Sequence, residues 1–93
     1  MFSGNLRTVT FEDGSQIDAI PPVAFYLCES LRSIEIPESV TFIGFDAFYE
    51  CTSLNSITFK GTMEQWNAIV KEYDWNIDIP ATYVQCSDGI VYI

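Results

Sequence analysis

Residues 31–53 read LRSIEIPESVTFIGFDAFYECTS, and the apolar residues of this stretch change their spacing partway along. The alternation across Ile34-Glu35-Ile36 predicts a short, half-buried strand. Pro37 ends this strand, because proline lacks the N–H that a strand ladder needs. Beyond Pro37 the apolar residues recur at steps of three and four, which predicts a helix-like return that faces inward. These residues are Val40, Ile43, Ala47, Phe48 and Cys51.

The same pattern begins again at Leu54, which repeats Leu31 after 54 − 31 = 23 positions. An upstream copy starts at Leu6, with two residues inserted near the turn-forming pair Asp13-Gly14. A strand and a return segment at a nearly fixed period are typical of a solenoid. We therefore predict an α/β repeat fold, a short solenoid with one strand per repeat, and repeats at residues 6–30, 31–53 and 54–61. Equivalent positions such as Phe25 and Phe48 are expected to stack in the core.

The third repeat departs from the pattern after residue 61. Thr62 and Gln65 have the spacing of a capping box, which predicts a helix whose apolar side carries Trp66. The last stretch, ATYVQCSDGIVYI, predicts a β-hairpin around residues 87–89. Terminal repeats of solenoids are atypical because they cover the exposed end of the core. We therefore predict that residues 62–93 form a C-terminal cap, with a helix and a hairpin, on a single domain of residues 1–93.

Composition excludes several classes of function. The 93 residues include thirteen Asp and Glu against four Lys and Arg, a formal charge of −9. This charge disfavours binding to nucleic-acid phosphates, so we expect no nucleic-acid partner. No apolar run approaches the roughly 18 residues of a membrane span, so no membrane insertion is expected either. The first residues, MFSGNLRTV, lack the features of a secretory signal.

The sequence offers little for catalysis or for a cofactor. It contains no histidine, which removes the commonest general base and the Ser–His and Cys–His pairs. Asp74, Asn76 and Asp78 imitate the start of a calcium loop, but Ile79 and Gln85 stand where such a loop needs glycine and glutamate. We therefore expect a chain that is not an enzyme and that has no metal site and no cofactor.

Three cysteines occur at positions 28, 51 and 86. Cys28 and Cys51 occupy equivalent places in two repeats, about 4.8 Å apart in a stacked array, within the Cα range of a disulfide. Their parallel Cβ bonds favour buried thiols instead.

Polar side chains lie between the buried positions of the repeat strands and are expected to point outward as ladders. Three of the four cations of the chain lie on or beside this surface. Concave solenoid faces often bind partners, although short polar residues also suit a solvated sheet and arginines also balance carboxylates. The predicted partner-binding residues are Arg7, Thr8, Thr10, Arg32, Ser33, Glu35, Asn55, Ser56, Thr58 and Lys60.

The motif L-x-x-I-x-I-P-x-x-V-x-x-I-G-x-x-A-F-x-x-C of residues 31–51 closely resembles the BspA-like leucine-rich repeat of many bacterial surface proteins. Residues 6–28 match the motif with the inserted turn, and the ending from FKGT to CSDG is similar to the closing segment of such proteins. The resemblance implies a leucine-rich-repeat solenoid that binds a protein or a host surface ligand. It also implies a bacterial surface or secreted location.

Two functions follow as hypotheses. The first is a non-catalytic module that recognises protein or glycan through the strand surface. The alternative is an acidic decoy that occupies the nucleic-acid groove of a partner by presenting carboxylates in place of phosphates. An affinity that collapses as salt rises would distinguish the decoy.

Self-association is a further expectation. No cap comparable to the C-terminal one precedes Leu6, so the first repeat is expected to expose its stacking surface. That surface would consist of Leu6, Val9, Phe11, Ile17, Ile20 and Phe25. Large exposed apolar surfaces normally mark interfaces, which predicts a homodimer through the N-terminal end.

Overall fold

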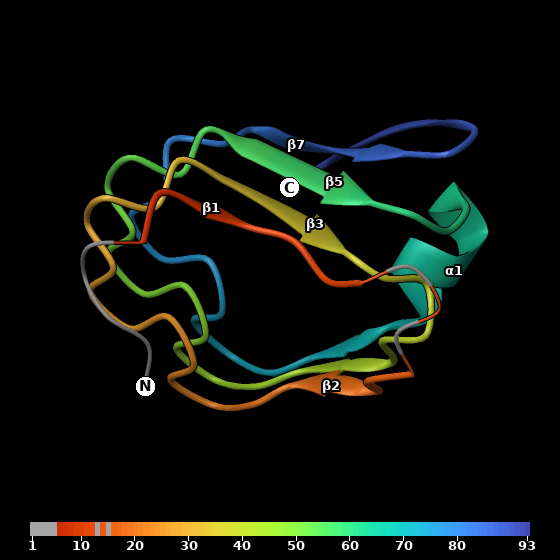
Figure 1. Ribbon diagram of the computed structural model, residues 1–93, viewed down its shortest axis with the longest axis horizontal. Coiled ribbons are helices and arrows are strands. Elements are labelled where there is room, and N and C mark those ends of the chain that lie inside the picture. The colour runs from red at the N-terminus through yellow and green to blue at the C-terminus, as the bar shows by residue number, and fades with distance from the viewer. Residues whose placement is uncertain (1–5, 13, 15) are drawn as a thin grey trace.

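Each turn of the chain contributes one strand to each of two sheets, as the computed structural model shows for residues 6–12, 14 and 16–93 (Figure 1). The result is a small β-solenoid of about three turns. The upper sheet in Figure 1 has the order β1 (Thr8–Val9), β3 (Ser33–Ile36), β5 (Ser56–Phe59), β7 (Tyr83–Cys86) and β8 (Gly89–Tyr92). The lower sheet has the order β2 (Ala19–Ile20), β4 (Phe42–Ile43) and β6 (Val70–Lys71). All neighbouring strands are parallel except β7 and β8, which form an antiparallel hairpin.

The strand register places equivalent residues of successive repeats side by side. Ile34 lies opposite Val9 on one side and Ile57 on the other. Ile34 and Ile36 are buried, whereas Ser33 and Glu35 between them are half-buried. A slip of one residue would turn every apolar side chain of the strand outward, so the alternation fixes this register.

The predicted helix-like return, and with it the single strand per repeat, is wrong. The return consists of a two-residue strand and a six-residue turn, at residues 22–27, 45–50 and 73–78. Asp46 and Glu50 have φ of 53° and therefore interrupt any right-handed helix. The N–H of Phe25 donates to the carbonyl of Ala47 in the next repeat at 2.8 Å, instead of to a carbonyl within its own segment. Apolar spacings of three and four thus arise here from a strand followed by a turn.

The third repeat extends beyond its predicted end at residue 61. Val70 pairs with Phe42, and the turn at 73–78 repeats the turn at 45–50. Residues 70–78, which were predicted as part of the cap, therefore complete the third turn of the solenoid. The spacing from the second repeat is 70 − 42 = 28 residues, because the helix α1 (Met63–Ala68) is inserted ahead of β6.

Helix α1 begins with the capping box that the sequence predicts. The N–H of Gln65 donates to Oγ1 of Thr62 at 3.1 Å, and the N–H of Thr62 donates to Oε1 of Gln65 at 2.8 Å. The N–H of Met63 also donates to Oδ1 of Asp88 at 2.8 Å, which ties the helix to the turn between β7 and β8. No helix among the described residues has both the length and the apolar character that crossing a membrane requires.

Aromatic rings run along the core from one repeat to the next. The predicted stacking of Phe25 and Phe48 is confirmed, with centroids 5.3 Å apart and planes 3° from parallel. Trp75 meets the edge of Phe48 at 6.2 Å and Trp66 at 5.8 Å. The core therefore continues without a break from the first turn to the inserted helix.

The first repeat exposes less of its stacking surface than the sequence predicts. Ile20 and Phe25 are only 2% and 1% exposed. The other four residues are half-buried and pack against the core: Leu6, Val9, Phe11 and Ile17. This surface therefore offers less apolar area than expected, and the homodimer stays a prediction.

Cys28 and Cys51 are buried thiols, as predicted; Cys86 is buried too, and none of the three forms a disulfide. The Sγ of Cys51 donates to the carbonyl of Phe25 at 3.0 Å. Burial raises the pKa of Cys51 from 9.0 to about 12. A thiol in this position is a core residue and a poor nucleophile.

Candidate functional site: the strand face

The outer surface of the five-stranded sheet, here called the strand face, carries the predicted ladders. Thr8, Ser33 and Ser56 lie side by side in the register, and the hydroxyl of Ser33 donates to Thr8 at 3.4 Å. Glu35 lies beside Thr58 in the second ladder. All ten predicted residues are exposed or half-buried: Arg7, Thr8, Thr10, Arg32, Ser33, Glu35, Asn55, Ser56, Thr58 and Lys60.

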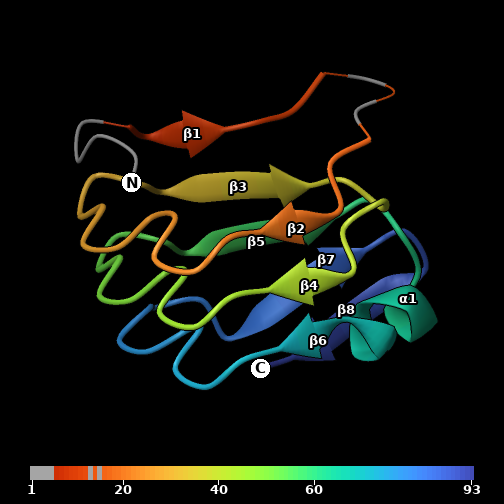
Figure 2. The ribbon, with the colours of Figure 1, turned by 90° about the horizontal axis from the view of Figure 1, so that it is seen from below.

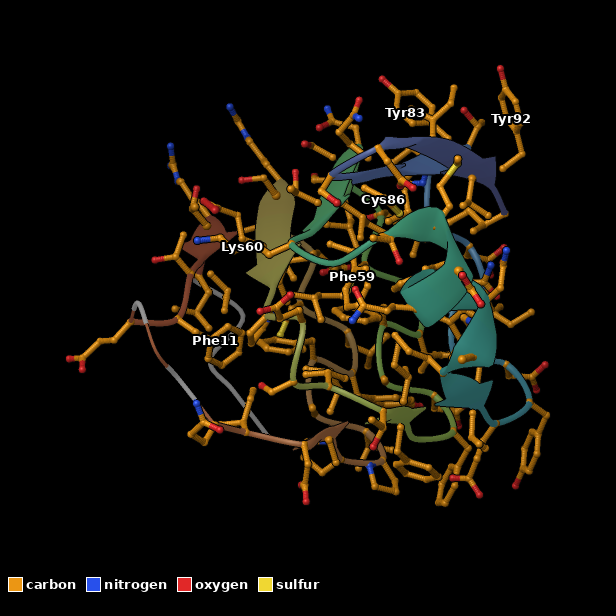
Figure 3. All side chains as sticks on the ribbon, turned by 90° about the vertical axis from the view of Figure 1, so that its right-hand side faces the viewer. Phe11, Phe59, Lys60, Tyr83, Cys86 and Tyr92 are labelled. Atoms are coloured by element: carbon orange, nitrogen blue, oxygen red, sulfur yellow. The ribbon has the colours of Figure 1, made fainter. Side chains whose placement is uncertain are left out.

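The closing hairpin extends the strand face, which the sequence analysis missed. Thr58 lies beside Gln85, and Gln85 lies beside Ile90 on the last strand. Tyr83 and Tyr92 also pair across the hairpin, with ring centroids 6.4 Å apart. They are 45% and 74% exposed, and Figure 3 shows both rings pointing away from the sheet. The alternation Tyr83-Val84-Gln85-Cys86 is the signal for this strand in the sequence, although the sequence pattern predicts these residues only as part of a cap.

Cationic side chains lie near both ends of the strands. The N–H of Arg32 donates to the carbonyl of Arg7 at 2.7 Å, and the N–H of Asn55 donates to the carbonyl of Arg32 at 3.1 Å. These bonds align the three exposed residues in a row where the strands begin. Lys60 follows β5 at the opposite end, with its Nζ 3.5 Å from a carboxylate oxygen of Glu35. Exposed ion pairs of this kind contribute only about 0–1 kcal/mol to stability, so Glu35 and Lys60 remain available to a partner at little cost.

A cleft of about 350 Å³ adjoins the strand face where β3 ends. Its walls include Phe11 and Glu12 from the first repeat, Glu35 and Glu38 from the second, and Lys60 from the third. Figure 3 views the molecule from this side and shows Phe11 and Lys60. The sequence does not predict this cleft, because the cleft lies between an inserted turn and the corner of the next repeat, which are far apart in the chain.

The described residues contain no group of three or more His, Cys, Asp or Glu side chains that could hold a metal ion. Asp74 and Asp78, which imitate a calcium loop in the sequence, lie instead at left-handed positions of the third turn segment. The arrangement of the strand face suits recognition: hydroxyls, an amide, ions of both signs and two exposed rings on one sheet.

Comparison with curated proteins finds no match, and comparison with solved structures finds none either. A family model described as a BspA type leucine-rich repeat region (6 copies) matches residues 1–73. Repeats of this family are typically non-catalytic and suggest a protein-binding module. The match covers most of the chain and agrees with the stacked turns of the structure, so the chain belongs to the BspA-type leucine-rich-repeat family.

Proposed function

We propose that this chain is a non-catalytic binding module that recognises a protein or a glycan through its strand face. One observation supports the proposal: the sheet register aligns Thr8 with Ser33 and Ser56, and Glu35 with Thr58. The other five predicted residues adjoin these strands and are exposed: Arg7, Thr10, Arg32, Asn55 and Lys60. Three of the four cations of the chain lie there although the net charge is −9. Such a concentration of cations favours a contact with a partner that carries acidic or hydroxyl groups.

The hairpin supplies the part of the surface that favours affinity. Tyrosine and arginine are enriched among the residues that dominate binding energy in interfaces. Tyr83 and Tyr92 lie on the last two strands of the sheet, and Arg7 and Arg32 immediately precede β1 and β3. A partner that spans the sheet would contact both kinds of residue, with the hydroxyl ladders between them.

The C-terminal elements fit the role of a cap that keeps this sheet in shape. Trp66 is buried beside Phe59, with ring centroids 5.5 Å apart. Helix α1 also contacts β8, the last strand of the sheet. We propose that the helix and the hairpin cover the end of the stack and hold Tyr83 and Tyr92 in place.

The test uses wild-type protein on panels of proteins and glycans, followed by variants against each ligand that binds. The double variant Arg32→Ala, Glu35→Ala should lose at least about tenfold in affinity, since it removes a central cation and the carboxylate that pairs with Lys60. The matched control is Glu64→Ala, Asn67→Ala, a pair of exposed residues on α1 that should leave affinity unchanged.

Two outcomes would overturn the proposal. One is that every ligand found keeps its affinity for the strand-face variant, or maps to the return segment 40–48. The other is an affinity that collapses between about 50 and 500 mM salt, with binding confined to nucleic-acid-binding proteins. The second result would indicate the acidic decoy instead.

A further inference from the structure

The turn segments 22–27, 45–50 and 73–78 form a second surface, here called the turn face. Figure 2 shows these segments stacked one above another on the side opposite α1. Backbone hydrogen bonds join them: the N–H of Leu27 donates to the carbonyl of Tyr49, and that of Glu50 to the carbonyl of Ile77, both at 2.9 Å. The turn face is therefore a fixed surface, although its segments are not strands.

Aromatic rings stack along the turn face in two places. Tyr26 and Tyr49 lie 5.2 Å apart between centroids, with planes 11° from parallel. Phe45 and Tyr73 lie 5.7 Å apart, with planes 7° from parallel. None of the four rings is fully buried, and Tyr73 is 70% exposed. These ladders present ring surface to solvent in addition to the Phe25–Phe48 stack inside the core.

A carboxylate follows each outward apolar residue in the second and third segments. The pairs are Phe45-Asp46, Tyr49-Glu50, Tyr73-Asp74 and Ile77-Asp78, and each acidic residue has φ between 53° and 61°. Aspartate tolerates this left-handed conformation better than most residues do. The backbone does not require an acid, however, because Val23 and Leu27 hold the same positions of the first segment with φ of 53° and 57°.

The charged side chains of the turn face are all acidic. Residues 22–27, 45–50 and 73–78 contain four Asp and Glu and no Lys or Arg. The nearest cation along the chain, Lys71, donates instead to the carbonyls of Trp66 and Ile69 at 2.8 and 3.2 Å. The carboxylate of Glu50 raises the pKa of the Tyr49 hydroxyl above 10.0, followed by burial and by smaller effects of Tyr26, Asp78 and Asp46. The rings therefore lie in a negative electrostatic potential.

We propose that the turn face is a docking surface for an arginine-rich segment of a protein partner. A guanidinium group stacks on aromatic faces and also pairs with carboxylates, so one side chain satisfies both features of this surface. The alternation of ring and carboxylate along each segment, and its recurrence in the next repeat, matches a peptide that presents several such groups. This docking is independent of the strand face, and either surface could fail without the other.

The probe is a fluorescein-labelled dodecapeptide of alternating glycine and arginine, titrated with the 93-residue protein at about 50 mM salt. Binding is measured by anisotropy, and the surface is located by NMR shifts of ring protons of Tyr49 and Tyr73. We expect a dissociation constant in the micromolar to submillimolar range. The lysine version of the peptide should bind about twofold to fivefold more weakly, because an ammonium group stacks less well on rings.

Two triple variants remove the same charge from different places. The turn-face variant carries Asp46→Asn, Glu50→Gln and Asp78→Asn. It should weaken peptide binding about tenfold, because each lost pair of a carboxylate and a guanidinium group costs a factor of about two to three. The control variant carries Glu12→Gln, Glu38→Gln and Glu64→Gln, which are exposed acids outside the turn face. It should weaken peptide binding less than about twofold. Tyr73→Ser removes an exposed ring and should cost about twofold to fivefold.

Four results would overturn the proposal. The first is no peptide binding by wild-type protein up to about 1 mM, and the second is an equal loss of peptide affinity in the two triple variants. The third is NMR shift changes confined to the strand face. The fourth is NMR shift changes on the turn face with the glycan cellohexaose but not with the peptide. The last of these would show a glycan surface. Should the turn-face triple variant lose its fold by circular dichroism, Tyr73→Ser and the wild-type ring shifts still decide the question.

Discussion

Replacing Phe48 by alanine should destabilise the protein more than any exposed substitution can. The ring is fully buried, stacked on Phe25 at 5.3 Å and met by the edge of Trp75 at 6.2 Å. Loss of a buried phenylalanine ring costs about 3–5 kcal/mol, and the cost rises when the cavity cannot close. Here it cannot, since hydrogen bonds from Phe25 to Ala47 and from Phe48 to Trp75 hold the backbones of the three repeats at fixed spacing. We therefore expect the upper half of this range.

A loss of this size is a large part of the roughly 5–15 kcal/mol that stabilises a typical domain. At roughly 4–8 °C for each kcal/mol in a domain of this size, the thermal midpoint should fall by at least about 16 °C. Circular dichroism during heating and urea titration measures both quantities. Tyr92→Ala is the control, because Tyr92 is mostly exposed and should cost no more than about 0.5 kcal/mol. If the two variants unfold at similar midpoints, the stacked core is not what stabilises the solenoid.

Three other expectations can be checked on the same protein. Gly44→Ala should destabilise the protein by about 1–3 kcal/mol in urea titrations, since a Cβ there would lie 2.3 Å from the backbone nitrogen of Pro22. Gly14→Ala should cost only about 1 kcal/mol, because a Cβ at that position meets no atom within 4 Å and only the φ of +81° is unfavourable. The pKa of Cys51 is about 12 in the folded state against an ordinary 9.0, so the contribution of its protonated thiol to the free energy of unfolding is fully present below pH 9 and is lost as pH rises toward 12. Cys51→Ala should remove this fall in stability at high pH. If stability falls equally in the variant, other groups cause the pH dependence. Sedimentation velocity at micromolar concentration should show a homodimer if the N-terminal end associates, and a monomer at every concentration would end that expectation.

The strands could be predicted from the sequence because their signal is local. Alternating side chains in Ile34-Glu35-Ile36 show which face is buried, and a fixed period then sets the register between repeats. The return segments could not be predicted this way. Their course depends on six left-handed residues, three of which are Val23, Leu27 and Glu50. These residue types do not favour that conformation, so tertiary contacts impose it and composition does not reveal it.

The candidate site divides in the same way. The ladders of the strand face follow from alternation, so their residues could be named in advance. The extension by Tyr83 and Tyr92 was missed because a hairpin at the end of a solenoid was assigned to the cap alone, whereas its first strand also joins the sheet. The aromatic ladders of the turn face depend on the stacking of turns, and Phe45 meets Tyr73 only because the insertion that holds α1 leaves the turn register unchanged.

The two faces also show why the net charge of −9 describes neither of them. A solenoid repeats each surface position once per turn, so a preference at one position becomes a row of similar groups. Arg7, Arg32 and Lys60 lie on or beside the strand face, while Asp46 and Asp74 take equivalent places on the turn face. A partner that approaches within about one Debye length, roughly 8 Å at physiological salt, responds to the nearby row more than to the total. The two proposals therefore assign partners of opposite charge to different sides of one small domain, because three cations lie on or beside the strand face whereas the charged residues of the turn face are all acidic.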